Sequence, residues 1–317
     1  MRGDAEKKMR ILVTGATGLI GSSLVPALAR QGYFVRAAAR DLSCLAAGPN
    51  IEPVAMPDLS TKADWSETLD GVTHVVHLAG IAHAPGALPD HVYSRINTDS
   101  VVKLAEQAKG HVERFVFMSS VRAQAGLSSP TPITEADTPS PTEIYGYTKL
   151  AAERQLAASG VDFTVLRPAV VYGPGVKGNI AALATIAKTP MPLPFGGLDN
   201  RRSLVAIENL ISSVTHVLRS EQTRNETYLV ADAAPISVAG IVGAMREGLG
   251  RPPQLVKMPS RAIRRLMKSF GREDDWERVC GAFEIDPSKL MATGWKPEIE
   301  SAEGIKRMMR LSHDQAT

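Results

Sequence analysis

The stretch EIYGYTK, residues 143–149, contains two tyrosines and a lysine, three side chains that could take part in proton transfer. Residues four apart lie on the same face of a helix, whereas residues two apart point in different directions. Tyr145 can therefore share a helix face with Lys149, and Tyr147 cannot. Because a Y-x-x-x-K spacing also occurs by chance in ordinary amphipathic helices, its meaning depends on the elements that position it.

The composition is typical of a globular protein with one large α/β domain or two lobes: 317 residues, 44% hydrophobic and 22% charged. A net charge of +3 does not indicate a nucleic-acid partner. No run of about eighteen apolar residues predicts a membrane span, and the charged start MRGDAEKKM lacks the apolar stretch of a secretory signal. Two cysteines make neither a disulfide framework nor a zinc set, so we expect a cytoplasmic protein without a metal.

Short β-branched and aromatic runs alternate with helical patterns in the first half of the chain, at residues 11–14, 33–39, 73–79, 114–120 and 162–168. This rhythm predicts βαβ units, and the nearly continuous apolar strands predict helices on both faces of a parallel sheet. We therefore predict an α/β fold with a doubly wound parallel Rossmann sheet at residues 9–173. Loops rich in Gly and Pro follow, which indicates a smaller α/β substrate-binding lobe at residues 174–317, with some segments returning to the first lobe.

The first predicted strand runs directly into TGATGLIG, whose three glycines are spaced by three and are followed by an apolar helix pattern. Glycines let the backbone turn tightly and approach a pyrophosphate, while the N–H groups and the dipole of the helix start favour negative charge. This position between strand and helix predicts a dinucleotide-binding turn. Its candidate cofactor-binding residues are Gly15, Thr17, Gly18, Leu19, Ile20 and Gly21.

The end of the second strand bears on which dinucleotide is bound. A chain that prefers NAD offers an acid to the adenosine ribose about twenty residues after the glycines. Here Ala39 takes the place of that acid and Arg40 follows, a pair that removes repulsion from a 2′-phosphate and offers it a guanidinium. NADP is thus favoured over NAD, with Asp41 as the alternative acid after a small shift. Asp58, after the third strand, and its neighbour Leu59 are candidates for the adenine edge.

Further segments follow the glycine turn over almost the whole chain, namely VVHLAG, FVFMSS, YGYTK, LRPAVVYGPG, RRSLVAIENL and GWKP. Together they resemble the extended short-chain dehydrogenase/reductase family, in particular its nucleotide-sugar epimerases, dehydratases and 4-ketoreductases. The resemblance implies that Tyr145 is the catalytic acid/base, that Lys149 binds the nicotinamide ribose and lowers the tyrosine pKa, and that Ser120 hydrogen-bonds the substrate oxygen. Lowering a tyrosine pKa from about 10 to about 7 requires roughly 4 kcal/mol of preferential stabilisation of the phenolate. Ser120 is preferred to Ser119 because the family motif uses the second serine at the strand end.

The resemblance implies further contacts to the cofactor and to the substrate. Leu78, Ala79 and Gly80 match a turn that passes beside the cofactor, and the backbone at Pro168 matches one that meets the nicotinamide carboxamide. His77 precedes this turn, but a histidine in an apolar strand is typical of a core residue, so we assign it no proton transfer. The predicted substrate-binding residues are Ser120, Arg122, Asn179, Leu193, Phe195 and Arg202, with Arg201 as an alternative to Arg202 and a solvent-exposed side chain as the alternative for Arg122.

Three activities compete within the resemblance. Val121 and Arg122 stand where a 4,6-dehydratase carries an acidic pair that transfers protons. Neither side chain can carry out those proton transfers. The choice is then between a 4-ketoreductase, which an NADP-type Ala39–Arg40 pair favours, and a 4-epimerase that retains NAD. The motifs are most similar to those of bacterial 4-ketoreductases that make UDP-N-acetylquinovosamine, so a UDP-linked sugar is the expected substrate. A non-catalytic nucleotide sensor is the alternative from a different class.

The sequence also bears on two surfaces of the protein, a dimer contact and a basic segment. The resemblance implies a homodimer formed through helices near residues 97–109 and 143–159. At residues 261–272 an apolar stripe alternates with basic residues, a pattern found on helices that contact anionic lipid. Such a stripe more often packs on its own lobe and leaves a solvated basic face, so membrane contact is not expected.

Overall fold

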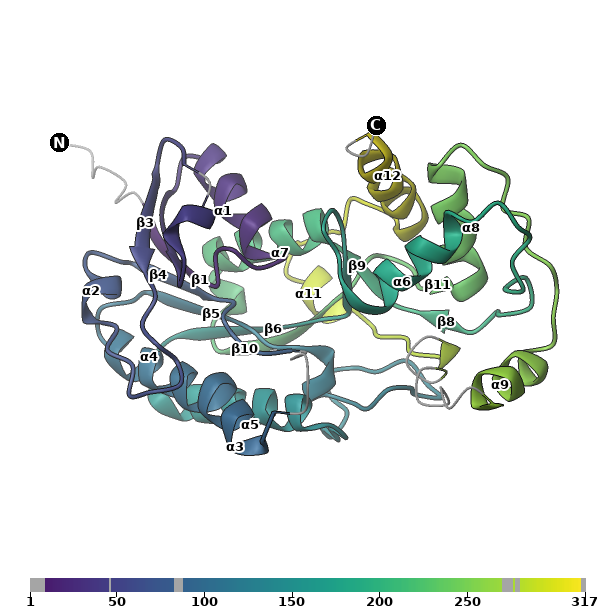
Figure 1. Cartoon of the computed structure of the whole chain (residues 1–317). Coiled ribbons are helices and arrows are strands. Elements are labelled where there is room, and N and C mark those ends of the chain that lie inside the picture. Colours follow the sequence, from purple (N-terminus) through teal and green to yellow (C-terminus); the bar gives the residue numbers. More distant parts are fainter. Residues whose placement is uncertain (1–8, 46, 83–87, 270–275, 277–279, 315–317) are drawn as a thin grey trace. The chain divides into compact units, whose positions relative to one another are not determined.

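The computed structural model describes residues 9–45, 47–82, 88–269, 276 and 280–314 (Figure 1). The chain divides into two compact units and passes between them several times. Unit 1 consists of Met1–Gln124, Pro139–Arg167 and Ile211–Tyr228, and unit 2 of Ala125–Thr138, Pro168–Leu210 and Leu229–Thr317. The boundary at residue 173 suggested by the sequence lies in unit 2, shortly after the passage from Arg167 to Pro168.

The described residues form a seven-stranded sheet with the order β10-β6-β5-β4-β1-β2-β3. Its strands are β1 (Arg10–Thr14), β2 (Phe34–Ala39), β3 (Ile51–Ala55), β4 (His74–His77), β5 (Arg114–Met118), β6 (Phe163–Pro168) and β10 (Glu226–Val230). The pairs from β3 through to β6 are parallel. The order of the strands reverses between β1 and β4, which makes this the point where a doubly wound sheet binds its ligand. The predicted α/β Rossmann fold is confirmed.

The strands of the centre are apolar because both faces of the sheet are covered. Every residue of β4 and β5 is buried, as are the last four residues of β1. One face packs against α4 (Ser100–Ala108) and α5 (Ile144–Ser159), whose Leu104 and Leu156 join Phe115 in a common core. Helices α1 (Gly21–Arg30) and α7 (Ile207–Arg219) lie on the opposite face (Figure 1). Strand β10 is absent from the predicted runs, because it enters the sheet from a distant part of the chain.

Short helical segments connect these elements. They are the 3-10 turns η1 (Leu42–Cys44), η3 (Val121–Ala123) and η4 (Glu221–Thr223), the helices α2 (Ser66–Leu69) and α3 (Asp90–Ser94), and the π-helical segment η2 (Arg95–Asp99). Helix α5 ends at Gly160, which adopts the left-handed conformation (φ 80°) that commonly terminates helices. The π-helical segment lies directly before α4, and such segments occur frequently at functional sites.

Unit 2 is built from helices around two small sheets. Strand β7 (Val170–Tyr172) pairs in parallel with β9 (Leu204–Ala206), and β8 (Arg201–Arg202) pairs antiparallel with β11 (Ile236–Ser237). The helices are α6 (Gly178–Ala187), α8 (Val238–Gly248), α9 (Ser260–Ser269), α11 (Ser288–Met291) and α12 (Ser301–Asp314). An apolar cluster joins α6, α8 and α12 through residues such as Leu183, Met245 and Ile305.

A buried carboxylate links several of these elements. Asp232 accepts hydrogen bonds from the Tyr172 hydroxyl (2.9 Å), the Ser301 hydroxyl (2.8 Å), the Asn209 side-chain amide (2.7 Å) and the Ala206 backbone N–H (2.9 Å). Burial raises the pKa of Asp232, whereas these four donors lower it. Because a buried polar group is tolerated only when its hydrogen bonds are made, this set of donors makes Asp232 a structural centre of unit 2.

The basic helix α9 belongs to unit 2. Its Ile263 is buried in a cluster with Leu198 and Val238, while Arg261 and Arg265 are exposed. Phe270 and Arg272 of the predicted stripe lie outside the described residues. The helix thus uses part of its apolar face to pack on its own unit. Among the helices of the described residues, none is both long enough and apolar enough to cross a membrane.

Candidate active site

The glycine turn joins β1 to α1 in the manner that the sequence predicts. Gly15 has a positive φ of 66°, and a Cβ there would lie 2.9 Å from the Ala79 backbone nitrogen. A Cβ on Gly21 would lie 2.3 Å from the Gly15 carbonyl oxygen. Neither site has room for a side chain, so only glycine allows the strand, the turn and the helix to approach this closely. Thr17 and Gly18 are exposed at the start of α1, and Leu19 and Ile20 are half-buried there, where N–H groups and the helix dipole attract an anion.

The end of β2 carries the residues that could face an adenosine ribose. Ala39 is buried as the last residue of the strand, and Arg40 is exposed. Asp41 caps η1, because its carboxylate accepts hydrogen bonds from the Ser43 N–H (3.0 Å) and hydroxyl (2.6 Å), and these bonds lower its pKa. The alternative acid is therefore engaged in its own turn. Arg40 and Asp41 are both exposed, and Arg40 is the one that directly follows the strand.

The predicted adenine-edge residues follow β3. Asp58 accepts hydrogen bonds from the Ser60 N–H (2.8 Å) and hydroxyl (2.7 Å), which lower its pKa, and the charge of Arg40 lowers it further. Arg40 and Asp58 therefore lie in the same part of unit 1. Leu59 is buried in the core beside Trp65, so its side chain is a packing residue and only its backbone could serve a cofactor.

The turn after β4 is anchored to β1 and lies next to the candidate catalytic lysine. Thr14 accepts hydrogen bonds from the N–H groups of Leu78 (3.2 Å) and Ala79 (3.3 Å). A Cβ on Gly80 would lie 3.0 Å from Asn97 Oδ1 and 3.5 Å from Lys149 Nζ. The structure thus brings the predicted cofactor turn and Lys149 together.

Asn97 belongs to η2, in the helical stretch that precedes Tyr145 in the sequence. Its side chain is fully buried, accepts a hydrogen bond from the Ile81 N–H (2.8 Å) and donates to the Ile81 carbonyl (2.9 Å) and the Thr148 hydroxyl (3.2 Å). It links the turn after β4 to α5. The spacing in the sequence carries no signal for this link, because the partners are far apart in the chain.

His77 has the environment of a core residue. Its ring lies among the rings of Trp65, Phe115 and Phe117. The hydroxyl of Thr14 already accepts two N–H groups, so it must donate to His77 Nδ1 (2.9 Å), which places the ring proton on Nε2. Burial, and next the charge of Lys149, lower the pKa of His77 to about 3. The neutral ring agrees with the expectation that His77 transfers no proton.

The tyrosine, the serine and the lysine form the chemical centre. Helix α5 begins at Ile144, so Tyr145 and Lys149 share a face, whereas the Tyr147 side chain is 54% exposed. The Ser120 side chain lies near the Tyr145 hydroxyl and lowers its pKa. Lys149 donates to the Met118 carbonyl (2.9 Å), and its ammonium lies 4.6 Å from the centre of the Phe117 ring.

Burial shifts the pKa values of Tyr145 and Lys149 in opposite directions. Burial raises the pKa of Tyr145, and the opposing effects are those of the Ser120 side chain and of the charge of Arg122 rather than that of Lys149. Burial lowers the pKa of Lys149 to about 8, against the attraction of Glu153. The lowering of the tyrosine pKa by Lys149, which the resemblance implies, stays a prediction.

A buried ion pair that the sequence analysis missed lies directly behind Lys149. Glu153 accepts hydrogen bonds from Arg167 Nε to both of its oxygens (3.0 and 3.2 Å) and from the Ser119 hydroxyl, and Arg167 also donates to the Gln124 side-chain oxygen. Both charged side chains are less than one-tenth exposed. The Ser119 hydroxyl is thus bonded to Glu153, whereas the Ser120 side chain lies near Tyr145. The signal for Glu153 was its position four residues after Lys149, which places it on the same helix face.

The predicted substrate residues of unit 2 do not form a common site in the described contacts. Asn179 is exposed near the start of α6, whereas Arg202 is only 4% exposed and donates to the Gly281 carbonyl. Its neighbour Arg201 is exposed and donates to the Pro235 carbonyl (2.8 Å). Arg202 is thus buried and bonded to a backbone carbonyl, and its contact with a diphosphate stays a prediction.

The other predicted residues after β6 also serve packing. Leu193 is buried in the core of unit 2, and its backbone exchanges hydrogen bonds with Gln254 (3.0 Å) and Val256 (2.8 Å). Phe195 is half-buried and packs against the two apolar clusters of the unit. Pro168 is buried at the end of β6 and is the first residue of its segment in unit 2.

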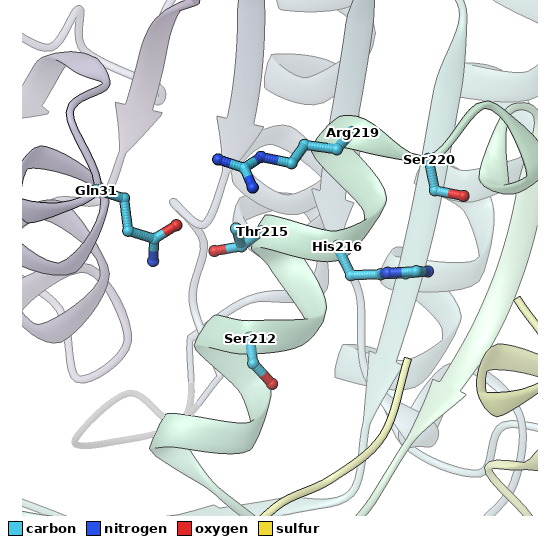
Figure 2. A pocket seen from close by; sticks show the side chains of 6 residues that line it. All are labelled: Gln31, Ser212, Thr215, His216, Arg219 and Ser220. Carbon is cyan, nitrogen blue, oxygen red and sulfur yellow. The ribbon is translucent and has the colours of Figure 1, made fainter. Parts of the chain in front are cut away.

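A cavity of about 450 Å³ lies elsewhere in unit 1 (Figure 2). It is lined by Gln31, Ser212, Thr215, His216, Arg219 and Ser220, none of which was predicted as a site residue. The Arg219 guanidinium, whose carbon lies 5.2 Å from the centre of the Tyr33 ring, also donates to the Tyr33 hydroxyl. This cavity is therefore separate from the tyrosine and lysine described above. In the described part of the chain no group of three His, Cys, Asp or Glu side chains could hold a metal ion.

The fold and the glycine turn define a dinucleotide-binding α/β protein. Residues 11–231 match the NAD dependent epimerase/dehydratase family, and the chain belongs to that family. It is 34% identical over 317 residues to a UDP-glucose 4-epimerase of Vibrio cholerae, covering 96% of both chains. It is 23% identical to a ceramide reductase of Caulobacter vibrioides, covering 93% of this chain and 88% of the relative. The protein is an enzyme of the NAD-dependent epimerase/dehydratase family.

A solved structure has the same fold. The UDP-glucose 4-epimerase of Thermotoga maritima, determined with UDP-glucose, superposes with a TM-score of 0.77 at 22% identity and covers 98% of this chain and all of its own. At this identity the likeness concerns the fold. The extended short-chain dehydrogenase/reductase resemblance of the sequence is confirmed by these matches.

Proposed function

We propose that the protein is an NADP(H)-dependent reductase that acts on the 4-keto group of a UDP-linked hexose of the UDP-N-acetylquinovosamine type. The residues at the end of β2 are the main support for a reductase whose cofactor dissociates. Ala39 is buried and Arg40 is exposed, while the carboxylate of Asp41 is engaged by Ser43. A 2′-phosphate would therefore meet a guanidinium and no free acid at this position.

The residues of unit 1 fit the chemistry of carbonyl reduction. The reduced nicotinamide, when bound, supplies the hydride. Ser120 orients the carbonyl oxygen through its hydroxyl, and Tyr145 donates its proton to the same oxygen as it becomes an alkoxide. The Ser120 side chain lies near Tyr145 and lowers its pKa, and this proximity supports a contact of both hydroxyls with one substrate oxygen. Lys149, held by the Met118 carbonyl beside Gly80, is placed to bind the ribose that accompanies the nicotinamide.

A UDP-hexose 4-epimerase with tightly bound NAD is the second candidate. The similarity to the Vibrio cholerae UDP-glucose 4-epimerase over nearly the whole chain favours it. The same tyrosine and serine would serve both reactions, since an epimerase also transfers a hydride and a proton at C4. The difference lies in whether the cofactor leaves after each turnover.

The first experiment identifies the cofactor. The purified chain is denatured and any released nucleotide is identified by mass spectrometry, and the empty protein is then titrated with NADPH and with NADH. We expect NADPH to bind more tightly, and Arg40→Ser to weaken NADPH binding roughly 10- to 100-fold while NADH binding changes little, because a charge-assisted contact is worth about 1.5–3 kcal/mol. Arg30→Ser, at another exposed arginine of unit 1, is the matched control. Near-stoichiometric NAD in the released fraction would contradict the reductase and favour the epimerase.

The second experiment tests the tyrosine. Tyr145→Phe removes the proton donor and keeps the ring, so turnover of 4-keto sugar nucleotides should fall at least 100-fold while NADPH binding persists. Unchanged turnover in this variant would remove Tyr145 from the mechanism. A protein that binds the nucleotide but turns over no sugar nucleotide, before or after the substitution, would support the sensor.

We also infer a homodimer formed through α4 and α5. These helices pack on each other, and α5 exposes the large ring of Tyr147. Light scattering of the purified chain tests this inference, and Tyr147→Glu should shift the protein toward the monomer if the ring lies in the contact. A monomeric wild type would contradict it.

A further inference from the structure

A buried ion pair in unit 1 is hydrogen-bonded to the chain on both sides of Ser120. Glu153 of α5 accepts a hydrogen bond from the hydroxyl of Ser119, the residue before Ser120. Arg167 of β6 donates to the side-chain oxygen of Gln124, which ends the turn that begins at Ser120. The charged side chains are joined by bonds from Arg167 Nε to both carboxylate oxygens (3.0 and 3.2 Å), so the two contacts belong to one network.

The four side chains of this network are shielded from water. Ser119, Gln124, Glu153 and Arg167 are each less than one-tenth exposed. Hydrogen bonds to charged groups are stronger than those between neutral groups, and a low local dielectric strengthens them further. The two ends of the turn are therefore held by strong bonds to α5 and to β6.

The backbone between these two contacts is itself hydrogen-bonded. The Ser119 N–H donates to the Leu166 carbonyl of the neighbouring strand (2.8 Å), and the Ala123 N–H donates to the Ser120 carbonyl (2.9 Å). The Ser120 side chain lies near Tyr145, which is on the same helix as the carboxylate that binds Ser119. One helix thus carries both the tyrosine and the anchor of the residue beside Ser120.

We propose that Ser119 and Gln124 are positioning residues, which fix the Ser120 hydroxyl beside Tyr145 so that one substrate oxygen can contact both hydroxyls. The proposal rests on the proposed roles of Ser120 and Tyr145 in carbonyl reduction. The buried ion pair then has a task besides its charge, because it holds a neutral reacting group in place through two neutral side chains.

The test changes the two neutral members of the network. Glu153 also acts on the charge of Lys149, so a change of the ion pair would mix two effects. Ser119→Ala removes the donor to the carboxylate, and Gln124→Met keeps the length of the side chain but not the acceptor. Ser119→Thr keeps a hydroxyl at the same position and is the conservative variant.

Ser301→Ala is the matched control. Ser301 is also a buried serine that donates to a buried carboxylate, that of Asp232 (2.8 Å). The network of Asp232 belongs to unit 2 and contains none of the predicted site residues. Its loss should cost stability of the same kind without moving Ser120.

The first readout is turnover of a UDP-linked 2-acetamido-2,6-dideoxy-4-ketohexose with NADPH. In Ser119→Ala and Gln124→Met we expect kcat to fall about 10-fold while KM for NADPH is unchanged, because a displaced reacting group is lost mainly from the transition state. Ser119→Thr and Ser301→Ala should stay close to the wild type. Wild-type kcat in both Ser119→Ala and Gln124→Met would overturn the positioning and leave the proposed reaction standing.

A double-mutant cycle separates positioning from a general loss of structure. In a Ser120→Ala background, Ser119→Ala should have little further effect on kcat, because the group through which it acts is gone. An equal fall of kcat in both backgrounds would overturn the proposal. If Ser119→Ala does not fold, Gln124→Met enters the same cycle.

The second readout does not depend on the substrate. The protein is labelled with tyrosine carrying carbon-13 at Cζ, and the Tyr145 signal is assigned by its loss in Tyr145→Phe. In Ser119→Ala and Gln124→Met this signal should move toward its position in Ser120→Ala, and in Ser301→Ala it should not move. Such a shift in a protein that turns over no sugar nucleotide would support the positioning while the proposed reaction fails. A signal that stays at the wild-type position in Ser119→Ala and Gln124→Met would overturn the positioning.

Discussion

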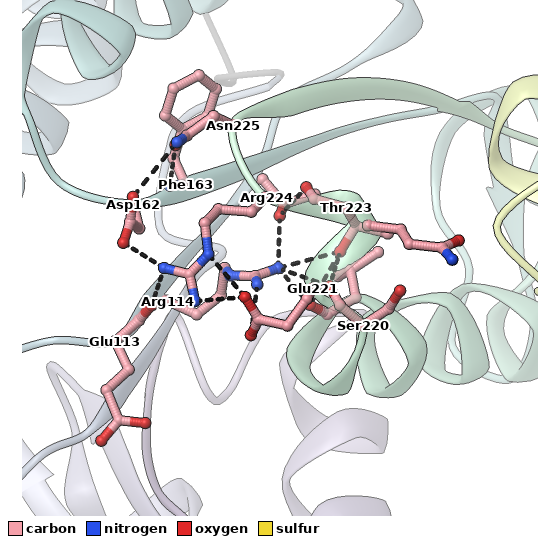
Figure 3. A network of polar contacts seen from close by, with 12 residues as sticks. Glu113, Arg114, Asp162, Phe163, Ser220, Glu221, Thr223, Arg224 and Asn225 are labelled. Atoms are coloured by element: carbon pink, nitrogen blue, oxygen red, sulfur yellow. Dashed lines mark hydrogen bonds and ion pairs between the residues drawn. The ribbon is translucent and has the colours of Figure 1, made fainter.

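Two buried arginines in unit 1 occupy opposite edges of the same sheet and use different partners. Arg167 is the last residue but one of β6, at the carboxyl edge, and is paired with the carboxylate of Glu153. Arg114 begins β5 at the opposite edge, is 2% exposed, and donates mainly to neutral oxygens (Figure 3). In the sequence both are arginines beside an apolar run. Their different partners therefore come from the segments that the fold brings next to them.

The partners of Arg114 belong to the end of α7 and the turn after it. Its guanidinium donates to the carbonyls of Val217 (2.8 Å) and Ser220 (3.2 Å) and to the hydroxyls of Thr223 (3.0 Å) and Thr164 (3.2 Å). Carbonyls at a helix end lack intrahelical partners and carry the negative end of the helix dipole. Arg114 therefore caps α7, while burial and the nearby charge of Arg224 lower its pKa.

The comparison distinguishes the amino edge of the sheet, where the arginine has a structural role, from the carboxyl edge, which carries the charged residues beside Lys149. At the amino edge an arginine satisfies neutral carbonyls and no acid is buried with it. At the carboxyl edge the acid is buried as well, and Glu153 supports the charge of Lys149 four residues earlier on α5. A buried ion pair contributes little net stability, so its presence beside Lys149 agrees with a role in arranging charges.

The largest effect is expected at the carboxyl edge. Glu153→Gln leaves the charge of Arg167 buried without its carboxylate, and we expect the free energy of unfolding to fall by about 3–5 kcal/mol. Urea unfolding measures this. Replacing both partners by methionine should recover most of the stability, since no charge is then buried alone. The exposed Arg154→Gln serves as a control and should change the free energy by less than about 0.5 kcal/mol. A double variant that is less stable than Glu153→Gln would mean that the pair itself stabilises the fold.

A smaller effect is expected at the amino edge. Arg114→Met leaves carbonyls and hydroxyls without a donor but no unpaired buried charge, so we expect a loss of about 2–3 kcal/mol in the same unfolding experiment. NADPH binding and turnover should be unchanged, because the site lies at the other end of the strands. A loss of NADPH affinity in the folded variant would contradict the division into two edges.

The smallest effect depends on pH and concerns His77 at the carboxyl edge. Its pKa is lowered in the folded state from the ordinary 6.5 to about 3, so between these values the unfolded chain binds the extra proton and stability falls as the pH falls. In His77→Leu the free energy of unfolding should no longer fall by up to about 1.4 kcal/mol per pH unit below 6.5. At pH 7 the variant should be about 1 kcal/mol less stable than the wild type, because the Thr14 hydroxyl loses its hydrogen-bond acceptor. Urea unfolding at pH 7, 6 and 5 compares the two proteins. In the control His111→Gln, at an exposed position, the free energy of unfolding should change with pH as in the wild type. If it also does so in His77→Leu, then His77 is protonated at its ordinary pKa.

Much of unit 1 could be predicted because its signals are local. The apolar runs that form β1, β2, β4, β5 and β6, and the glycine turn, follow from backbone and burial rules that act over a few residues. The same holds for Tyr145 and Lys149, which one helical turn separates. In unit 2 the residue types suggested ligands, but Arg202 and Leu193 are buried in contacts with distant segments. Local patterns do not show whether a polar side chain is needed for packing.

The sequence by itself determined the class of fold, the place of the dinucleotide turn and the pairing of Tyr145 with Lys149, because strand periodicity, glycine geometry and helical spacing are properties of neighbouring residues. Only the tertiary structure decided that the Ser119 hydroxyl bonds Glu153 and that Arg167 pairs with the same carboxylate. Hydrogen bonds and charges act through space, and their partners become neighbours only when the strands and helices pack.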